Sequence, residues 1–461
     1  MSEAIPHQDP RLLDNRGIAG HPRGLMVLFF TEMWERFSYY GMRALLILFL
    51  VAPAAQGGMG IPLAKAAGIY GTYEMSVYLA SLPGGWVADR WLGQRKAVAL
   101  GAALIALGEF ILAASPTIHV FFAGLAVIVA GTGLLKPNAA TLVGALYADN
   151  DARRDPGFTI YYMGVNLGAL IAPLICGFLA QDPVFLNFLT RMGLASTSGW
   201  RWGFGAAGAA MVLGLIQFGL QQAKFGSAGL KPGSQQVEHG HASTREPLTP
   251  EERKRLWVVA ILFVFSVIFW MTYQQAGSSL NLFADRLTRS QVLGWSFPST
   301  WFQSVNSAWL LLLAPILSWL WVRMGHRDPS SPAKFALGLL FVGLGMLLLV
   351  PAARMATPLT RVAPWWLVGT YGLHTIGELL LSPVGLSTTT KLAPARYQGL
   401  MMGVWYVSLG LGSKLAGKVA GLFETLPLPT IFGSLFVMTA VAALVLALLT
   451  PRIKRLMGGV R

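Results

Sequence analysis

Charged residues and cysteine are both scarce in this sequence. Aspartate, glutamate, lysine and arginine together make up 12% of 461 residues, whereas hydrophobic residues make up 54%. An ordinary soluble globular domain carries about 25% charged residues, so this composition excludes that class and indicates a membrane protein. The single cysteine, Cys176, excludes an intramolecular disulfide and a cysteine-based metal cluster. We expect neither a cofactor nor a metal ion.

Acidic residues are the scarcer of the two charge types, with 20 acidic against 35 basic residues and a formal net charge of +15. Such a surplus can indicate nucleic-acid binding, but here the basic residues lie mostly in short loops between apolar runs, where they set membrane topology. We therefore expect no nucleic-acid partner. Residues 1–23 lack the basic and apolar order of a cleavable signal peptide, so we expect insertion to begin at the first span.

Apolar runs of about 20 residues, the length that crosses a bilayer, predict twelve transmembrane helices. They lie near residues 24–50, 69–91, 96–115, 118–147, 157–180, 201–223, 254–283, 300–322, 333–351, 364–390, 397–422 and 427–449. Alternate loops are rich in lysine and arginine, so the positive-inside rule predicts that both termini are cytoplasmic. We predict an all-α membrane protein.

A polar segment near the middle of the chain divides the spans into two sets of six. Six spans, a polar cytoplasmic bridge and six further spans are typical of transporters whose substrate site lies between two related bundles. The predicted domains are a cytoplasmic segment (1–23), an N-terminal bundle (24–223), a linker (224–253), a C-terminal bundle (254–450) and a cytoplasmic tail (451–461).

The first span carries polar residues along one side. Six residues share this face at 3.6 residues per turn: Glu32, Glu35, Arg36, Tyr39, Tyr40 and Arg43. Four ionised groups cost about 12 kcal/mol at mid-bilayer, whereas some fifteen apolar neighbours return only about 7. The stripe therefore faces other helices or a wet cavity. It marks a substrate, ion or proton pathway, or alternatively a buried structural ion-pair network.

The turn after the second span reads G-G-W-V-A-D-R-W-L-G-Q-R-K over residues 84–96. It resembles the G-x-x-x-D-R-x-x-G-x-R-K/R signature of the major facilitator superfamily. The resemblance implies a fold of twelve transmembrane helices in two six-helix bundles. Asp89, Arg90 and Arg95 are then expected to be conformational-gate residues rather than ligand contacts.

Segments in both halves resemble one family of that superfamily. E-M-W-E-R-F-S-Y-Y-G, from Glu32, resembles the E-x-x-E-R-F-x-Y-Y-G motif of the proton-dependent oligopeptide transporter family, also called POT or PTR2. Residues 158–170, 268–285 and 377–394 resemble its fifth-, seventh- and tenth-span signatures. The resemblance implies proton-driven uptake of dipeptides and tripeptides, with Glu32, Glu35 and Arg36 tied to proton coupling.

The chemistry of a zwitterionic peptide fits residues elsewhere in the spans. Arg43 and Lys136 suit the peptide carboxylate, and Glu378 suits its ammonium group. Lys136 and Glu378 are also expected to take part in proton coupling. The alternative for Lys136 is a pairing with a glutamate that holds helices together.

Amide and aromatic side chains complete the predicted peptide site. Asn166 and Asn306 can bond a peptide backbone through donor and acceptor, although contacts between helices are equally compatible with both. Wide apolar faces with a polar handle suit pockets for varied side chains, although tryptophan can also be an interfacial anchor. The predicted pocket residues are Tyr39, Tyr40, Tyr78, Trp270, Trp405 and Ser408.

The chain departs from the family pattern in two spans. Gln274 stands where the seventh span of the family commonly has a glutamate, so an ion pair between that glutamate and Arg43 cannot form. Glu74, in the second span, is a carboxylate at a position where a small or neutral residue is expected. Our hypothesis is that Glu74 partly replaces the missing charge by pairing with Arg43. We assign Glu74 and Gln274 to gating, with Asp89 and Arg90.

These observations predict a monomeric, proton-coupled symporter in the bacterial inner membrane. It would import di- and tripeptides by alternating access, with the peptide in a central cavity and with protons and membrane lipid as the other partners. A major facilitator for nitrate or an amphipathic drug is the alternative. A sensor without transport is disfavoured, and no G-x-S-x-G, H-E-x-x-H or phosphate-binding loop in a credible context indicates an enzyme.

Overall fold

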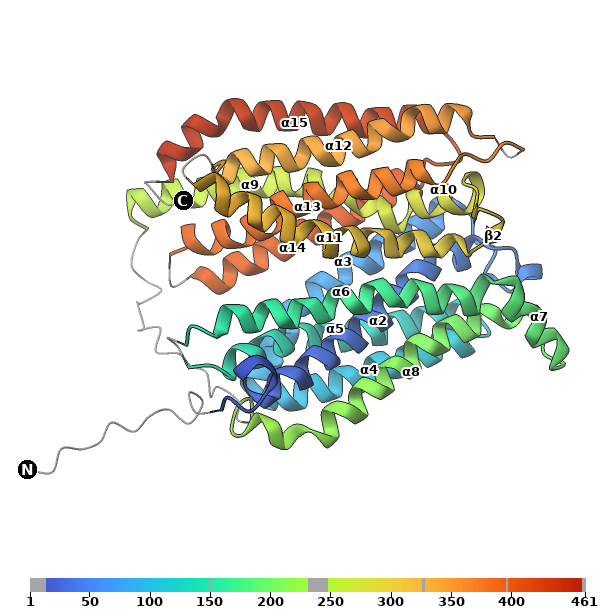
Figure 1. The fold of residues 1–461 in the computed structure, drawn as a ribbon, viewed down its shortest axis with the longest axis horizontal. Coiled ribbons are helices and arrows are strands. Elements are labelled where there is room, and N and C mark those ends of the chain that lie inside the picture. Colours follow the sequence, from blue (N-terminus) through green and yellow to red (C-terminus); the bar gives the residue numbers. More distant parts are fainter. Residues whose placement is uncertain are drawn as a thin grey trace, which may run out of the picture. The chain divides into compact units, whose positions relative to one another are not determined.

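A computed structural model describes residues 14–148, 151–230, 248–325, 328–357, 359–394 and 397–457 (Figure 1). Helices account for nearly all of the described chain. Its only strands are β1 (Gln291–Val292) and β2 (Trp295–Ser296), which pair antiparallel as a small hairpin. The predicted all-α fold is confirmed.

Twelve helices of the described chain correspond in residue range to the twelve predicted spans (Figure 1). They are α2 (Arg23–Val51), α3 (Leu63–Val87), α4 (Gln94–Ala114), α5 (Ile118–Ala145), α6 (Arg154–Gln181), α8 (Gly199–Leu220), α9 (Pro250–Tyr273), α11 (Phe302–Met324), α12 (Ser331–Met355), α13 (Trp365–Leu392), α14 (Gln398–Ala420) and α15 (Leu428–Leu456). By length and composition, eight candidate spans in the described residues are apolar enough to cross a membrane. The other four helices, α2, α3, α13 and α14, include the ionisable residues Glu32, Glu74, Glu378 and Lys414.

Two short helices were not predicted. α7 (Pro183–Arg191) follows α6, and α10 (Ser279–Leu287) follows α9 after a 3₁₀ turn over Gln274–Gly277. The predicted span 254–283 is therefore two helices joined at the position of Gln274. Most of the predicted linker, residues 231–247, lies outside the described residues. α9 begins at Pro250 with a capping box, in which the Thr249 hydroxyl accepts from the Glu252 amide at 3.1 Å.

The chain forms two compact units, each of which is considered by itself. Unit 1 comprises residues 1–42, 80–172 and 204–236, and unit 2 comprises residues 43–79, 173–203 and 237–461. The division passes through helices α2, α3, α6 and α8 rather than between them. The two six-helix bundles predicted for residues 24–223 and 254–450 remain a prediction about domains.

Close helix contacts in unit 1 depend on glycine. A Cβ atom added to Gly84 of α3 would lie 1.9 Å from the carbonyl oxygen of Gly133 on α5, so no larger residue fits there. Apolar side chains from several helices, Leu28, Ile105, Leu135 and Met211 among them, form the buried core of this unit. Small residues and apolar packing together hold α2, α4, α5 and α8.

The core of unit 2 is more aromatic. The rings of Trp270 on α9 and Trp405 on α14 meet edge to face, with centroids 6.5 Å apart, and Phe335 of α12 lies 6.4 Å from Trp405. α12 packs against both α13 and α15. Gly71 of α3 and Gly417 of α14 permit close backbone approach, because a Cβ on Gly71 would lie 3.0 Å from the Gly417 Cα. The first half of α3 is therefore closely packed against α14.

Candidate functional site

A buried ion-pair cluster lies on α2 within unit 1, and we name it the Arg36 cluster after the arginine at its centre. Two N–H groups of Arg36 donate to Glu35, and its Nε atom lies 3.3 Å from Oε1 of Glu32. Tyr161 of α6 donates its hydroxyl to the other oxygen of Glu32 at 2.6 Å. The three charged side chains are no more than 6% exposed. Two carboxylates share one guanidinium, so binding one proton would make these three side chains neutral taken together.

Four other predicted site residues belong to unit 1. The Arg36 guanidinium lies 4.9 Å from the centre of the Tyr39 ring, and Tyr39 meets Tyr40 edge to face. Lys136 of α5 is half-buried and interacts electrostatically with Glu32. Asn166 is buried on α6 and donates to the carbonyl of Tyr162 within the same helix. Their roles in peptide binding remain predictions.

A second arginine of α2 forms the Arg43 cluster in unit 2, with Tyr70 and Glu74 of α3 and Gln274. Arg43 donates through Nε to the Tyr70 hydroxyl at 2.8 Å and through a terminal N–H to Oε1 of Gln274 at 2.6 Å. Its Nε atom also lies 3.5 Å from Oε1 of Glu74. The expected ion pair between Arg43 and Glu74 is therefore confirmed. The Glu74 carboxylate balances the charge of the Arg43 guanidinium, and the Gln274 amide oxygen accepts from a terminal N–H of Arg43.

The end of α9 at Tyr273 positions Gln274 for this contact. The following 3₁₀ turn is buried, and the Gln274 amide also donates to the Ser413 hydroxyl of α14 at 3.2 Å. A Cβ atom on Gly277 would lie 1.8 Å from the Tyr70 hydroxyl, so the turn requires glycine there. Asn281 of α10 donates to the carbonyl of Ala44 at 2.8 Å. These bonds connect the second half of α2 to α9, α10 and α14 within unit 2.

Glu378 of α13 lies in a third polar cluster, which also belongs to unit 2. Tyr273 donates its hydroxyl to Glu378 and lies 3.2 Å from Oδ1 of Asn306. Asn306 of α11 in turn donates to the Thr375 hydroxyl at 2.8 Å. Glu378 is partly exposed, and it accepts from the neutral hydroxyl of Tyr273. Its contact with a peptide ammonium group remains a prediction.

The aromatic pocket residues of unit 2 are mostly buried. Trp270 and Trp405 are 5% and 7% exposed and belong to the core, against which the half-buried Tyr78 also packs. The indole N–H of Trp270 has no hydrogen-bond partner among the described residues. Ser408 is fully buried and lies 2.9 Å from the Ser266 hydroxyl, which joins α14 to α9. Their contact with a ligand remains a prediction.

The glycine-rich turn after α3 makes contacts that were not predicted. Asp89 and Arg90 are exposed, and Asp89 accepts from the Gln94 amide at 3.1 Å. Arg95, at the start of α4, donates to the carbonyls of Gly226 and Ala228 at 2.5 Å each. Arg95 thus fastens the segment after α8 to the first turn of α4. The gating roles of Asp89 and Arg90 remain predictions.

Comparison with known proteins identifies the family. A profile described as the POT family matches residues 95–234 and 234–432, which is more than half of the chain. The chain belongs to the POT family. It is 38% identical to the peptide transporter YePEPT of Yersinia enterocolitica over 96% of each protein. It is 31% identical to a di-/tripeptide transporter of Lactococcus lactis subsp. cremoris, covering 96% of this chain and 98% of that relative.

Solved structures of POT family members share this fold. A crystal structure of a mutant peptide transporter POT in complex with alafosfalin superposes with a TM-score of 0.86 and 37% sequence identity. The match covers 97% of this chain and 98% of that one. The twelve-helix major facilitator fold expected from the sequence is therefore the fold of this POT family member.

Three tyrosines at the site were missed by sequence reasoning. Tyr70, Tyr161 and Tyr273 each join a charged residue of one of the clusters through the phenol hydroxyl. Tyr161 lies inside the fifth-span segment that resembles the family signature, and Tyr70 lies one helical turn before Glu74. The family signature around Tyr161 and the helical spacing between Tyr70 and Glu74 were visible in the sequence. Neither pattern indicates which residue the phenol hydroxyl contacts. That depends on how the helices pack.

Proposed function

We propose that this POT family member is a proton-coupled symporter that imports di- and tripeptides by alternating access. The observation that carries the proposal is the Arg36 cluster, in which two buried carboxylates face one guanidinium. Buried charges in membrane helices are costly and usually mark ion or proton pathways. Because two carboxylates compete for one guanidinium, one of them can bind or release a proton while the other keeps its ion pair with Arg36.

Peptide is the substrate class that the side chains favour. The relatives named above are a peptide transporter and a di-/tripeptide transporter. Arg43 and Lys136 are cations suited to the peptide carboxylate, and Glu378 is a partly exposed carboxylate suited to its ammonium group. Nitrate, the substrate of the alternative transporter, has no cationic group for Glu378 to bind. Binding of an amphipathic drug does not require both a cation and a carboxylate in the site.

The proton gradient supplies enough energy for this transport. One proton that enters down a potential of about 150 mV releases roughly 3.4 kcal/mol. At 1.4 kcal/mol for each factor of ten, this sustains a gradient of roughly 300-fold for a zwitterion without net charge. A carrier with one proton per peptide therefore suffices.

The proposal includes location and partners. The transporter is a monomer in the bacterial inner membrane, surrounded by lipid, with both termini in the cytoplasm, and it is not an enzyme. The orientation is supported by basic residues at the ends of the chain's helices, such as Arg452, Lys454 and Arg455 at the end of α15. Membership in a family of transporters supports the absence of enzymatic activity.

Uptake into liposomes tests this function. Purified full-length protein is reconstituted, an inward proton gradient and an inside-negative potential are imposed, and labelled dialanine is followed with tripeptide, nitrate or free amino acid as competitors. We expect accumulation well above tenfold that competes with tripeptide and collapses with a protonophore. Accumulation of another solute without any uptake of peptide contradicts the proposed substrate class.

A further inference from the structure

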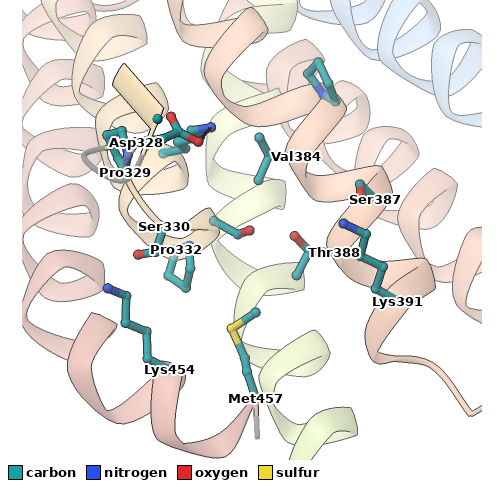
Figure 2. A pocket seen from close by; sticks show the side chains of 14 residues that line it. Asp328, Pro329, Ser330, Pro332, Val384, Ser387, Thr388, Lys391, Lys454 and Met457 are labelled. Atoms are coloured by element: carbon teal, nitrogen blue, oxygen red, sulfur yellow. Dashed lines mark hydrogen bonds and ion pairs between the residues drawn. The ribbon is translucent and has the colours of Figure 1, made fainter. Parts of the chain in front are cut away.

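The two ends of α11 in unit 2 border different cavities. The cavity of Figure 2 is lined by Gly325, directly after α11, and by Lys454 near the end of α15. Basic residues at the end of α15 make this side cytoplasmic in the proposed orientation. A second cavity, of about 760 Å³, is lined by Ser299, just before α11. It lies at the opposite end of this helix and therefore faces the periplasm.

The second cavity is lined by residues of unit 2, from helix ends that are far apart in the sequence. Its volume lies within the range of about 300–1,000 Å³ that is common for ligand sites. Leu48 and Val51 line it, and they lie about 8 and 12 Å beyond Arg43 along the axis of α2. Among the described lining residues, none is predicted for peptide binding or proton coupling. The cavity is therefore a separate space on the periplasmic side of the Arg43 cluster.

The described residues of this cavity include a carboxylate and a guanidinium without an ion-pair partner. Asp285 of α10 is half-buried and accepts from the Ser299 hydroxyl at 2.7 Å, but it pairs with no basic residue in the described part of the chain. The neighbouring Arg286 is paired with Glu424 at 2.6 Å, so its charge is balanced. Arg361 is exposed, and its side chain makes no ion pair or hydrogen bond with any described residue. The cavity therefore presents one negative and one positive charge.

Backbone contacts hold Arg361 near the end of α10. The amide of the next residue, Val362, donates to the carbonyl of Leu287 at 2.9 Å, and its carbonyl accepts from the amide of Arg289 at 2.8 Å. The segment between α12 and α13 is thereby fixed to residues that follow Asp285 by about one helical turn. The two charged side chains thus line the same cavity, and the contacts that place them are with other residues.

We propose that this cavity is an outer capture site, which binds a di- or tripeptide before the peptide reaches the central site. The inference rests on the proposed function and adds a second binding step to it. Arg361 binds the peptide carboxylate, for which a guanidinium offers two parallel N–H donors, and Asp285 binds the peptide ammonium group. The Ser299 hydroxyl keeps the Asp285 carboxylate in place. Opposite charges in one cavity raise the capture rate of a zwitterion and favour it over solutes of a single charge.

Initial rates of uptake by the full-length protein test the site. Wild type, R361Q and R289Q are compared in liposomes under an imposed proton gradient, with labelled dialanine at a range of external concentrations. Arg289 is the matched control, because it is an exposed arginine near Asp285 that does not line the cavity. We expect the KM of R361Q to rise about tenfold, as the loss of one charge-assisted hydrogen-bonded pair predicts, with Vmax within about twofold of wild type. The control should stay within about twofold in both quantities.

Peptide analogues separate carboxylate binding from a structural role of Arg361. Alanyl-alaninamide lacks the carboxylate, so its inhibition constant against dialanine uptake should agree within about twofold between wild type and R361Q. N-acetyl-dialanine lacks the ammonium group, so its inhibition constant should be equally insensitive to D285N. A similar rise of the inhibition constants of unlabelled dialanine and its amide in R361Q would contradict the site, because a distorted structure weakens both.

A conservative variant guards against misfolding. R361K keeps the positive charge beside Asp285 and should hold the KM within about threefold of wild type. A KM as high in R361K as in R361Q would contradict binding by charge. An unchanged KM in R361Q, while wild type accumulates dialanine, would overturn this inference alone. Absence of dialanine uptake by wild type would instead overturn the proposed function, and the capture site with it.

Discussion

Arg36 and Arg43 lie two turns apart on α2, but their surroundings differ in charge. Arg36 contacts two carboxylates, whereas Arg43 contacts one carboxylate, an amide and a phenol. Among the side chains in direct ion-pair contact, the Arg36 cluster therefore has one carboxylate more than guanidinium groups, and the Arg43 cluster has equal numbers; Lys136 also interacts electrostatically with Glu32. A buried excess of negative charge favours proton uptake, whereas a charge-balanced cluster can exchange its hydrogen-bond partners without binding a proton.

The origin of the partners differs as well. Both carboxylates of the Arg36 cluster come from α2 itself, at positions 32 and 35. The partners of Arg43 come from α3 and from the turn after α9, so that cluster joins segments that are far apart in the sequence. In the proposed mechanism the first cluster binds the proton, and the second opens and closes contacts within unit 2.

The largest effect is expected when the excess carboxylate is removed. Glu32→Gln leaves the bonds between Arg36 and Glu35 intact but makes the cluster neutral, so it resembles the Arg43 cluster. We expect proton-driven accumulation to fall from the roughly 300-fold limit to about onefold. Exchange of labelled for unlabelled peptide, which needs no net proton movement, should continue. Uptake in liposomes with and without a proton gradient measures both.

A matched control exists in the same unit. Glu109 of α4 is also fully buried and accepts from the Ser38 hydroxyl at 3.3 Å, with no ion pair to a basic residue in the described part of the chain. Glu109→Gln should leave accumulation within about twofold of wild type, because its carboxyl is not part of the Arg36 cluster. Loss of accumulation in both variants would mean that the effect is not specific to excess charge beside Arg36.

A smaller loss of uptake is expected when the number of carboxylates beside Arg43 is changed. Gln274→Glu gives Arg43 two carboxylates, and Glu74→Gln gives it none. Each change leaves one unbalanced buried charge, so we expect uptake to fall roughly tenfold in each, about 1.4 kcal/mol. Unchanged accumulation in Glu74→Gln would remove Glu74 from the mechanism.

The double variant E74Q/Q274E decides whether charge balance is the cause. It moves the single carboxylate from α3 to the turn after α9 and restores a net charge of zero. We expect uptake to return to within about threefold of wild type, which is a coupling between neighbours of the kind that double-mutant cycles measure. Additive losses in the double variant would show that the two side chains act independently of their charge.

Much of this comparison was predictable from the chain. The charged face of α2 is buried at Glu32, Glu35, Arg36 and Arg43, as the cost of exposing it to lipid required. The pairing of Arg43 with Glu74 followed from a missing charge at one position and an extra one at another. The first argument uses only the cost of buried charge and helix periodicity, whereas the second also uses the resemblance to the family, because Gln274 and Glu74 are departures from the family pattern.

Other features were not predictable because they depend on tertiary contacts. Arg95, for which a gating role remains a prediction, donates to carbonyls more than 130 residues away in the sequence. Ser408, whose contact with a peptide remains a prediction, is buried against Ser266 of another helix. A hydroxyl or a carbonyl partner leaves no pattern in the sequence, whereas a charge in an apolar run does. The sequence therefore predicts which residues are unusual better than it predicts what they contact.

The smallest effect concerns the pH dependence of stability at His21, which lies outside the membrane helices. It must be distinguished from the pH dependence of transport that we assign to the Arg36 cluster. His21 precedes α2, and its Nδ1 lies 2.9 Å from the Tyr147 hydroxyl. Burial lowers the pKa of His21 from its ordinary value of 6.5, and Arg153 lowers it further, while Asp151 acts in the opposite direction. His21 therefore binds a proton more readily in the unfolded chain than in the folded one. The contribution of neutral His21 to the stability of the folded state is complete above pH 6.5. It is lost as the pH falls through the lowered pKa.

His21→Gln removes this dependence. Between pH 7.5 and 5, we expect the Tm of wild type to fall by about 2 °C more than that of the variant. Tyr147→Phe is the control, since it deletes the hydroxyl but keeps the imidazole beside Arg153, and it should retain the acid dependence. Peptide uptake measured against pH should be the same in His21→Gln and wild type, because the proton that drives transport is assigned to the Arg36 cluster. A shifted uptake profile in His21→Gln would make this histidine a second transport-linked proton site, and the contrast between the two arginine clusters would no longer account for coupling.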